Sequence, residues 1–89
     1  MYIKAQEVRI EKGIHARPSA KITEYALSKP NTHIWIEYPK EGTFASASSV
    51  VDILTLCVPF GSTVIIKSEG EEEKEAALHI ARIIEDFKP

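Results

Sequence analysis

The stretch KGIHARPSA, residues 12–20, holds a glycine, a histidine, an arginine and a proline within six positions. Glycine interrupts a strand, and proline is well tolerated in the first turn of a helix, where a missing N–H has no partner to lose. The stretch therefore predicts a junction between a first strand over residues 2–10 and a helix over residues 16–29. His15 falls at this junction, and Arg17 falls in the first turn of the helix.

A histidine at the start of a helix is well placed to carry a phosphoryl group. The first turn leaves backbone N–H groups unpaired and carries about half a positive charge, so anions bind there. The guanidinium of Arg17 adds a fork of donors. An imidazole is nucleophilic near neutral pH, and donors around the phosphoryl oxygens supply most of what phosphoryl transfer requires. Residue types alone leave a second interpretation open, in which His15 is an ordinary surface or capping residue.

The rest of the chain predicts a small α+β protein. We expect three further strands. Apolar and polar residues alternate over residues 32–38, and turns precede the other two segments, residues 43–47 and 62–68. Helical spacing predicts a short helix from Val50, with Ser48 or Ser49 as its N-cap, and a long helix over residues 71–87. We expect one domain, residues 1–89, with a four-stranded antiparallel sheet and three helices on one face.

Composition excludes several classes of protein. Eleven basic and thirteen acidic residues leave a net charge of −2, which does not provide the basic surface that nucleic acid requires. No apolar run approaches the ~18 residues of a membrane span, and the first residues predict no secretory signal. The single cysteine, Cys57, excludes an internal disulfide. We therefore expect a cytoplasmic protein without membrane insertion, nucleic-acid partner, metal or cofactor.

Other conspicuous residues have ordinary interpretations. Five of the thirteen acidic residues lie between positions 69 and 75, where acids complement the dipole at the start of a helix. We expect His33 on the outer face of its strand and His79 on the solvent side of the last helix. Trp35 is expected on the uncovered face of the sheet, either screened by long neighbouring side chains or as part of a self-association patch. We otherwise expect a monomer.

The run GIHARPSA, residues 13–20, resembles the active-site signature of the HPr family, the histidine-containing phosphocarriers of the bacterial sugar phosphotransferase system. The resemblance covers essentially the whole chain. It includes the order of the elements, the sequence IEY at residues 36–38 and the sequence EGEEEKEAA at residues 69–77. It implies the HPr-like open-faced sandwich as the fold.

The resemblance also implies roles for individual residues. His15 would carry the phosphoryl group on Nδ1, Arg17 would attend the phosphate, and the N–H groups of Ala16 and Arg17 would help to hold it. HPr accepts the group from enzyme I and passes it to the A domain of a sugar-specific enzyme II. We therefore expect a carrier between two protein partners rather than an enzyme with a small-molecule pocket.

Two further features of the family fall at the short helix. Counting back from Gly61 places the regulatory serine, the target of an HPr kinase, at Ser49. Ser48 and Asp52 depart from the usual neighbours, and the acid would repel a phosphate one turn away, so Ser49 is equally well read as only an N-cap. The family's docking surface for partners falls on three apolar residues: Val50, Val51 and Leu54.

Two functions remain open from the sequence. The first is a general phosphocarrier in sugar uptake. The second is a regulatory HPr paralogue, which docks on a transcriptional regulator or serves a nitrogen- or dihydroxyacetone-linked phosphorelay. Regulators of this kind often lack the histidine, so His15 favours the carrier. Asp52 and the VPF turn at residues 58–60 are atypical and favour the paralogue.

Overall fold

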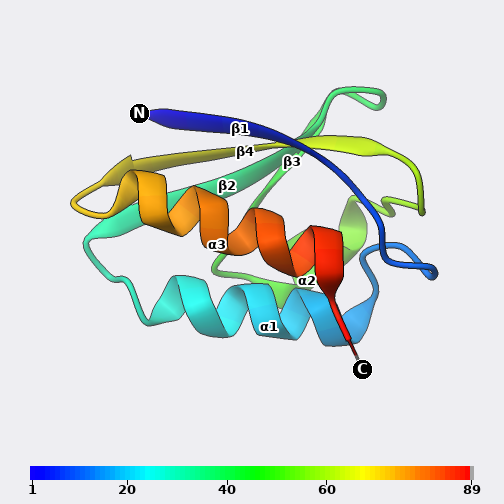
Figure 1. Ribbon diagram of the computed structural model, residues 1–89, viewed down its shortest axis with the longest axis horizontal. Helices are drawn as coiled ribbons and strands as arrows, with labels where there is room; N and C mark the ends of the chain where they lie inside the picture. Colours follow the sequence, from blue (N-terminus) through cyan, green and yellow to red (C-terminus); the bar gives the residue numbers. More distant parts are fainter. Residues whose placement is uncertain (89) are drawn as a thin grey trace.

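A computed structural model describes residues 1–88 and shows a four-stranded sheet covered on one face by helices (Figure 1). The elements follow in the order β1 (Tyr2–Glu7), α1 (Ala16–Leu27), β2 (Thr32–Tyr38), β3 (Thr43–Ser46), α2 (Val50–Thr55), β4 (Thr63–Gly70) and α3 (Glu73–Asp86). All neighbouring strands pair antiparallel, in the spatial order β1-β4-β2-β3. The expected α+β open-faced sandwich is confirmed. Among the described residues, no helix is long and apolar enough to cross a membrane.

The two central strands form the floor of the core. Ile34 and Ile36 of β2 face the helices and are buried, and so are Val64 and Ile66 of β4. Ile36 lies opposite Ile66 in the pairing of the two strands, so their side chains meet on the same face. The alternation predicted for residues 32–38 is therefore confirmed.

The first strand is shorter than expected, since β1 ends at Glu7 and not at residue 10. After it, the N–H of Val8 donates to Ser62 O over 2.7 Å, and the N–H of Arg9 donates to Ile84 O over 3.2 Å. The backbone thus turns from the sheet towards the end of α3. Gln6 faces inward but is only half-buried, because β1 is an edge strand, and an edge position tolerates a polar side chain there.

Both long helices bury one face. The buried residues of α1 are Pro18, Ser19, Ile22, Thr23 and Ala26. Those of α3 are Ala76, Ala77, Ile80, Ala81, Ile83 and Ile84, in agreement with the predicted stripe. The alanines allow α3 to pack closely on β1, β4 and β2. α1 ends at Leu27, two residues before the predicted end, and the Ser28 hydroxyl donates to Tyr25 O over 2.6 Å.

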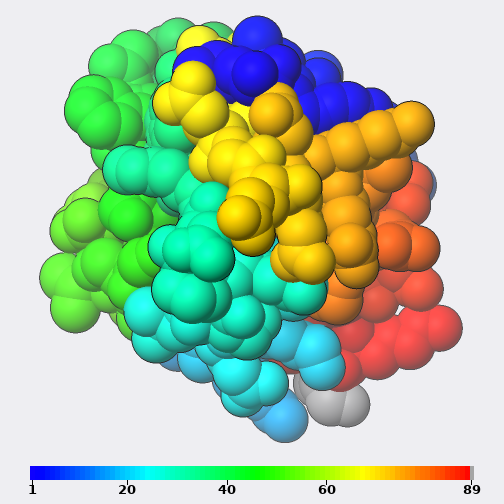
Figure 2. Space-filling view, turned by 90° about the vertical axis from the view of Figure 1, so that its left-hand side faces the viewer, coloured from blue at the N-terminus to red at the C-terminus, as the bar shows by residue number. Residues whose placement is uncertain are grey.

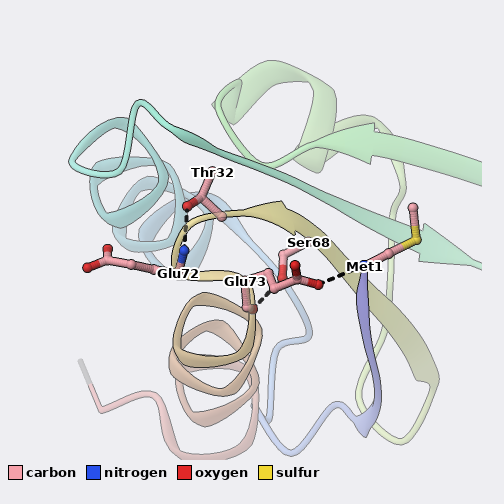
Figure 3. A network of polar contacts seen from close by, with 5 residues as sticks. All are labelled: Met1, Thr32, Ser68, Glu72 and Glu73. Atoms are coloured by element: carbon pink, nitrogen blue, oxygen red, sulfur yellow. Dashed lines mark hydrogen bonds and ion pairs between the residues drawn. The ribbon is translucent and has the colours of Figure 1, made fainter.

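Two acids of the run, Glu73 and Glu75, lie in the first turn of α3, as expected. The N–H of Glu72 donates to Thr32 Oγ1 over 3.2 Å, and the Ser68 hydroxyl donates to Glu73 O (Figure 3). Glu73 also pairs with the Met1 amine at 2.8 Å, and this hydrogen bond raises the pKa of the amine. In Figure 2 the residues of this turn, in yellow and gold, lie between β1 above and the end of α1 below. α3 begins at Glu73 and not at residue 71, because Glu72 is its N-cap and has a non-helical backbone, with φ = −122° and ψ = 37°.

His79 is only partly exposed, so the expectation that it lies on the solvent side of the last helix is met only in part. Its ring is half-buried and stacks on Tyr25 of α1, with ring centroids 3.8 Å apart and an angle of 9° between the planes. Burial lowers the pKa of His79, and the nearby Arg82 acts in the same direction. The lowered pKa favours the neutral imidazole in this contact between α1 and α3.

The open face of the sheet carries Trp35 and His33, as predicted. Trp35 is half-buried and lies edge-on to the His33 ring, with centroids 5.1 Å apart. Lys67 lies opposite Trp35 in the strand pairing and forms a 2.8 Å ion pair with Glu37. Long neighbouring side chains thus screen the indole, while self-association through Trp35 stays a prediction.

The short helix α2 ends in a left-handed residue that is not glycine. Cys57 follows the C-cap, has φ = 52° and donates its N–H to Leu54 O over 3.2 Å. Helices often end this way, but glycine is preferred, because a Cβ in this conformation costs about 1–2 kcal/mol.

We expect Cys57→Gly to stabilise the protein. The relief of strain exceeds the added flexibility of the unfolded chain, leaving a gain of about 0.5–1 kcal/mol, or a rise of roughly 2–8 °C in Tm. Thermal unfolding followed by circular dichroism measures it. Cys57→Ala is the matched control, since it removes the thiol but keeps the Cβ. An equal gain in both variants would assign the effect to the sulfur atom and not to the backbone.

Candidate functional site

Three segments far apart in the sequence meet at one end of the molecule. They are the β1–α1 loop, the chain between α2 and β4, and the end of α3, all at the right of Figure 1. The N–H of Ile14 donates to Val58 O over 2.9 Å, and the N–H of Arg9 donates to Ile84 O over 3.2 Å. The loop that carries His15 is therefore held by backbone bonds to both of the other segments.

Gly13 is the residue that allows this contact. It has φ = +72°, and a Cβ at this position would lie 2.3 Å from Val58 O and 2.9 Å from Pro59 Cα. Both neighbours are backbone atoms and cannot swing away. The close approach, and with it the bond from Ile14 to Val58, requires a residue without a side chain.

His15 is the N-cap of α1 and has an extended backbone, with φ = −96° and ψ = −166°. Its carbonyl accepts the first helical bond, from the N–H of Ser19 at 3.1 Å. The imidazole makes no capping hydrogen bond and is half-buried. Phe87, at the end of α3, lies edge-on to it, with ring centroids 6.1 Å apart and an angle of 87° between the planes.

Two backbone N–H groups are free at the start of α1. Pro18 has no N–H, and Ser19 donates to His15 O, so the N–H groups of Ala16 and Arg17 are those left without an intrahelical partner. The side chain of Arg17 is exposed at the same turn. Free N–H groups, the positive end of the helix dipole and an exposed guanidinium are features that favour an anion at the start of α1.

α2 is at the same end and packs on α1. Ser49 is its N-cap, and Ser49 Oγ accepts the N–H of Asp52 over 3.2 Å. Of the three expected surface residues, Val51 is 69% exposed and Leu54 is 38% exposed, while Val50 is half-buried. Val51 and Leu54 therefore face outward, Val50 does so only in part, and their role as a docking surface stays a prediction. The capping role of Ser49 is what the structure shows, and its phosphorylation stays a prediction.

Sequence reasoning missed two features of this end of the molecule. Phe87 was identified only as part of the apolar stripe of α3, because nothing in the sequence links residue 87 to residue 15. The left-handed conformation of Cys57 was also missed. Its one signal is the nearby VPF turn, which shows that α2 must end but not in which conformation.

Comparison with known proteins shows the family to which the chain belongs. A family model described as the PTS HPr component phosphorylation site matches residues 4–86. The chain belongs to the HPr family. It is 33% identical to the phosphocarrier protein HPr of Vibrio cholerae over 87 residues, which cover 98% of this chain and 99% of that protein. It is also 33% identical to the HPr-like protein Crh of Halalkalibacterium halodurans over 85 residues, covering 96% and 98% of the two chains.

The fold agrees with solved structures of the family. The crystal structure of HPr from Bacillus anthracis superposes with a TM-score of 0.83 at 29% identity and covers 93% of this chain and 95% of that one. The chain is thus an HPr-family phosphocarrier of the phosphotransferase system.

Proposed function

We propose that this chain accepts a phosphoryl group on His15 from enzyme I and passes it to the A domain of a sugar-specific enzyme II. The observation that carries the proposal is the place of His15, at the start of α1, with no capping bond on its imidazole. On this proposal the whole chain, residues 1–89, works as one phosphocarrier domain in the cytoplasm.

In the transfer step, Nδ1 of His15 attacks the phosphorus of the donor. A P–N bond forms on His15 as the bond from phosphorus to the donor's leaving atom breaks, and the three oxygens spread the negative charge. The N–H groups of Ala16 and Arg17 and the Arg17 guanidinium stabilise these oxygens. In the transfer to enzyme II, the P–N bond on His15 breaks as a bond forms between phosphorus and the acceptor atom of enzyme II. The chain is then free to accept another phosphoryl group, so it is a carrier between its partner enzymes and not itself an enzyme.

The docking surface proposed for both partners is the outward side of α2. Val51 and Leu54 are exposed at the end of the molecule that carries His15, with Val50 half-buried beside them. An apolar patch bordered by polar groups suits a transient interface that must form and release. Each partner would then bring its own phosphoryl site to His15 in turn.

A second candidate function is regulatory, and the similarity to Crh favours it. Here an ATP-dependent HPr kinase would phosphorylate Ser49, and the modified chain would dock on a transcriptional regulator. The new phosphate would lie one turn from the acid Asp52, which disfavours it. His15 favours the carrier, and incubation with such a kinase and ATP tests the alternative through an acid-stable phosphate on Ser49.

Phosphoryl uptake and delivery test the main proposal directly. The full chain is incubated with enzyme I and phosphoenolpyruvate, and its mass is measured before and after exposure to acid. We expect one added phosphoryl group that is lost in acid and is removed by an enzyme II A domain. A chain that takes up no acid-labile phosphate under these conditions would show that it is not a carrier.

Arg17→Ala should slow transfer by about 10- to 100-fold without unfolding the protein. A single oxyanion donor is worth on the order of 100- to 1000-fold in well-studied sites, and a carrier loses less because its partners supply donors of their own. Arg17 is exposed, so little packing is lost. Single-turnover rates with enzyme I measure the effect.

Lys21→Ala is the matched control for Arg17, because Lys21 is also exposed and lies one turn further along α1. We expect its transfer rate to stay near that of the wild type. An equal loss in both variants would mean that positive charge on α1 serves docking in general and that Arg17 has no special role at His15.

A further inference from the structure

The imidazole of His15 has little to hold it in place from its own helix. Its side chain makes no capping hydrogen bond, and it is only half-buried. A side chain on an open helix start has three staggered positions about its first torsion, and neighbouring groups decide which is populated. Phosphoryl transfer with help from the N–H groups of Ala16 and Arg17 requires one orientation of the ring, and a group outside α1 must select it.

Phe87 lies where it can restrict the orientation of the His15 imidazole. It lies where the chain leaves α3, with φ = −67° and ψ = 128°, and its ring is half-buried against the apolar core. The bond from the N–H of Arg9 to Ile84 O, one helical turn earlier, ties the end of α3 to the loop before His15. The Phe87 ring is therefore anchored on the core side before it meets the imidazole.

The contact between the two rings is perpendicular, with centroids 6.1 Å apart and an angle of 87°. This edge-to-face arrangement is one that aromatic pairs prefer, since the positive edge of one ring meets the negative face of the other. It constrains orientation as well as position, because rotation of the imidazole about its first torsion would separate the rings.

We propose that Phe87 is a positioning residue, whose ring holds the His15 imidazole in the orientation needed for phosphoryl transfer. The proposal rests on the proposed function of His15 as the phosphoryl acceptor. In this proposal Phe87 itself touches no reacting atom. Its contribution is to reduce the number of orientations that the imidazole samples before attack.

Kinetics of Phe87→Leu test the proposal, since leucine keeps an apolar side chain but has no ring. We expect the maximal rate of phosphoryl uptake from enzyme I to fall by about three- to tenfold, the size of a lost aromatic pair, with an unchanged half-saturation concentration. Phe87→Tyr, which keeps the ring, should restore the rate. A raised half-saturation concentration at normal maximal rate would overturn the proposal and make Phe87 a docking residue.

The Ile83→Val variant is the control for a loosened helix end. Ile83 is buried in the last turns of α3, so this change loses packing without altering the ring contact. Its maximal rate should match that of the wild type. A loss equal to that of Phe87→Leu would assign the effect to the helix end and overturn the proposal.

NMR spectroscopy separates this proposal from the proposed function, because it needs no phosphoryl donor. In Phe87→Leu we expect the His15 ring protons to change chemical shift and its Hα–Hβ couplings to move toward rotamer averages, while His33 stays unchanged. Unchanged His15 couplings would overturn the positioning role even if the chain is a carrier. Changed couplings in a chain that accepts no phosphoryl group would leave the contact in place and refute the carrier function instead.

Discussion

His15→Ala is expected to abolish phosphoryl uptake from enzyme I, with a fall in rate of roughly three orders of magnitude or more. Alanine has no nucleophile, and the donors of Ala16 and Arg17 cannot act without an acceptor atom beside them. The fold should survive, because the His15 side chain is half-buried and makes no capping bond. Mass spectrometry after incubation with phosphoenolpyruvate and enzyme I measures the loss.

The other two histidines provide the controls. His33 is exposed on the open face of the sheet, so His33→Ala should take up phosphate at the rate of the wild type. His79 is stacked on Tyr25 and is expected to affect stability and not uptake. If His15→Ala still gained one acid-labile phosphoryl group, the acceptor would be another residue and the site would be misassigned.

Much of the fold could be predicted because its signals are local. The alternation in residues 32–38 is carried by each residue's own preference for one face of the sheet, and β2 has these bounds. The start of α1 could also be predicted from the sequence, since Pro18 restricts where a helix can begin. The end of β1 could not be predicted. The chain leaves the sheet where the N–H groups of Val8 and Arg9 donate to the carbonyls of residues 62 and 84, which are distant in the sequence.

The site also has a part that the sequence could predict and a part that it could not. His15, Ala16 and Arg17 are adjacent in the sequence, so a local motif was enough to bring them together. Phe87 reaches His15 only through the packing of α3, and His79 meets Tyr25 only through the spacing of two helices. Contacts of this kind depend on tertiary geometry, which periodicity within one element does not contain.

Gly13→Ala is expected to destabilise the protein by about 3 kcal/mol or more, a large part of the ~5–15 kcal/mol that holds a domain of this kind together. Two effects add at this position. The conformation at φ = +72° strains any residue with a Cβ, and the Cβ would lie 2.3 Å from Val58 O. Urea unfolding of both proteins measures the difference.

Gly42→Ala separates the two effects. Gly42 has nearly the same conformation, φ = +65°, but a Cβ there would meet nothing within 4 Å. It should therefore cost only the strain, about 1 kcal/mol, and leave phosphoryl uptake unchanged. In Gly13→Ala the clash must push the loop away from Val58, lengthen the bond from Ile14 and move His15 relative to the end of α3. The fraction that stays folded should then transfer more slowly than the wild type. Equal losses of stability in the two variants would show that the loop relaxes freely, and that close packing on Val58 does not hold His15 in place.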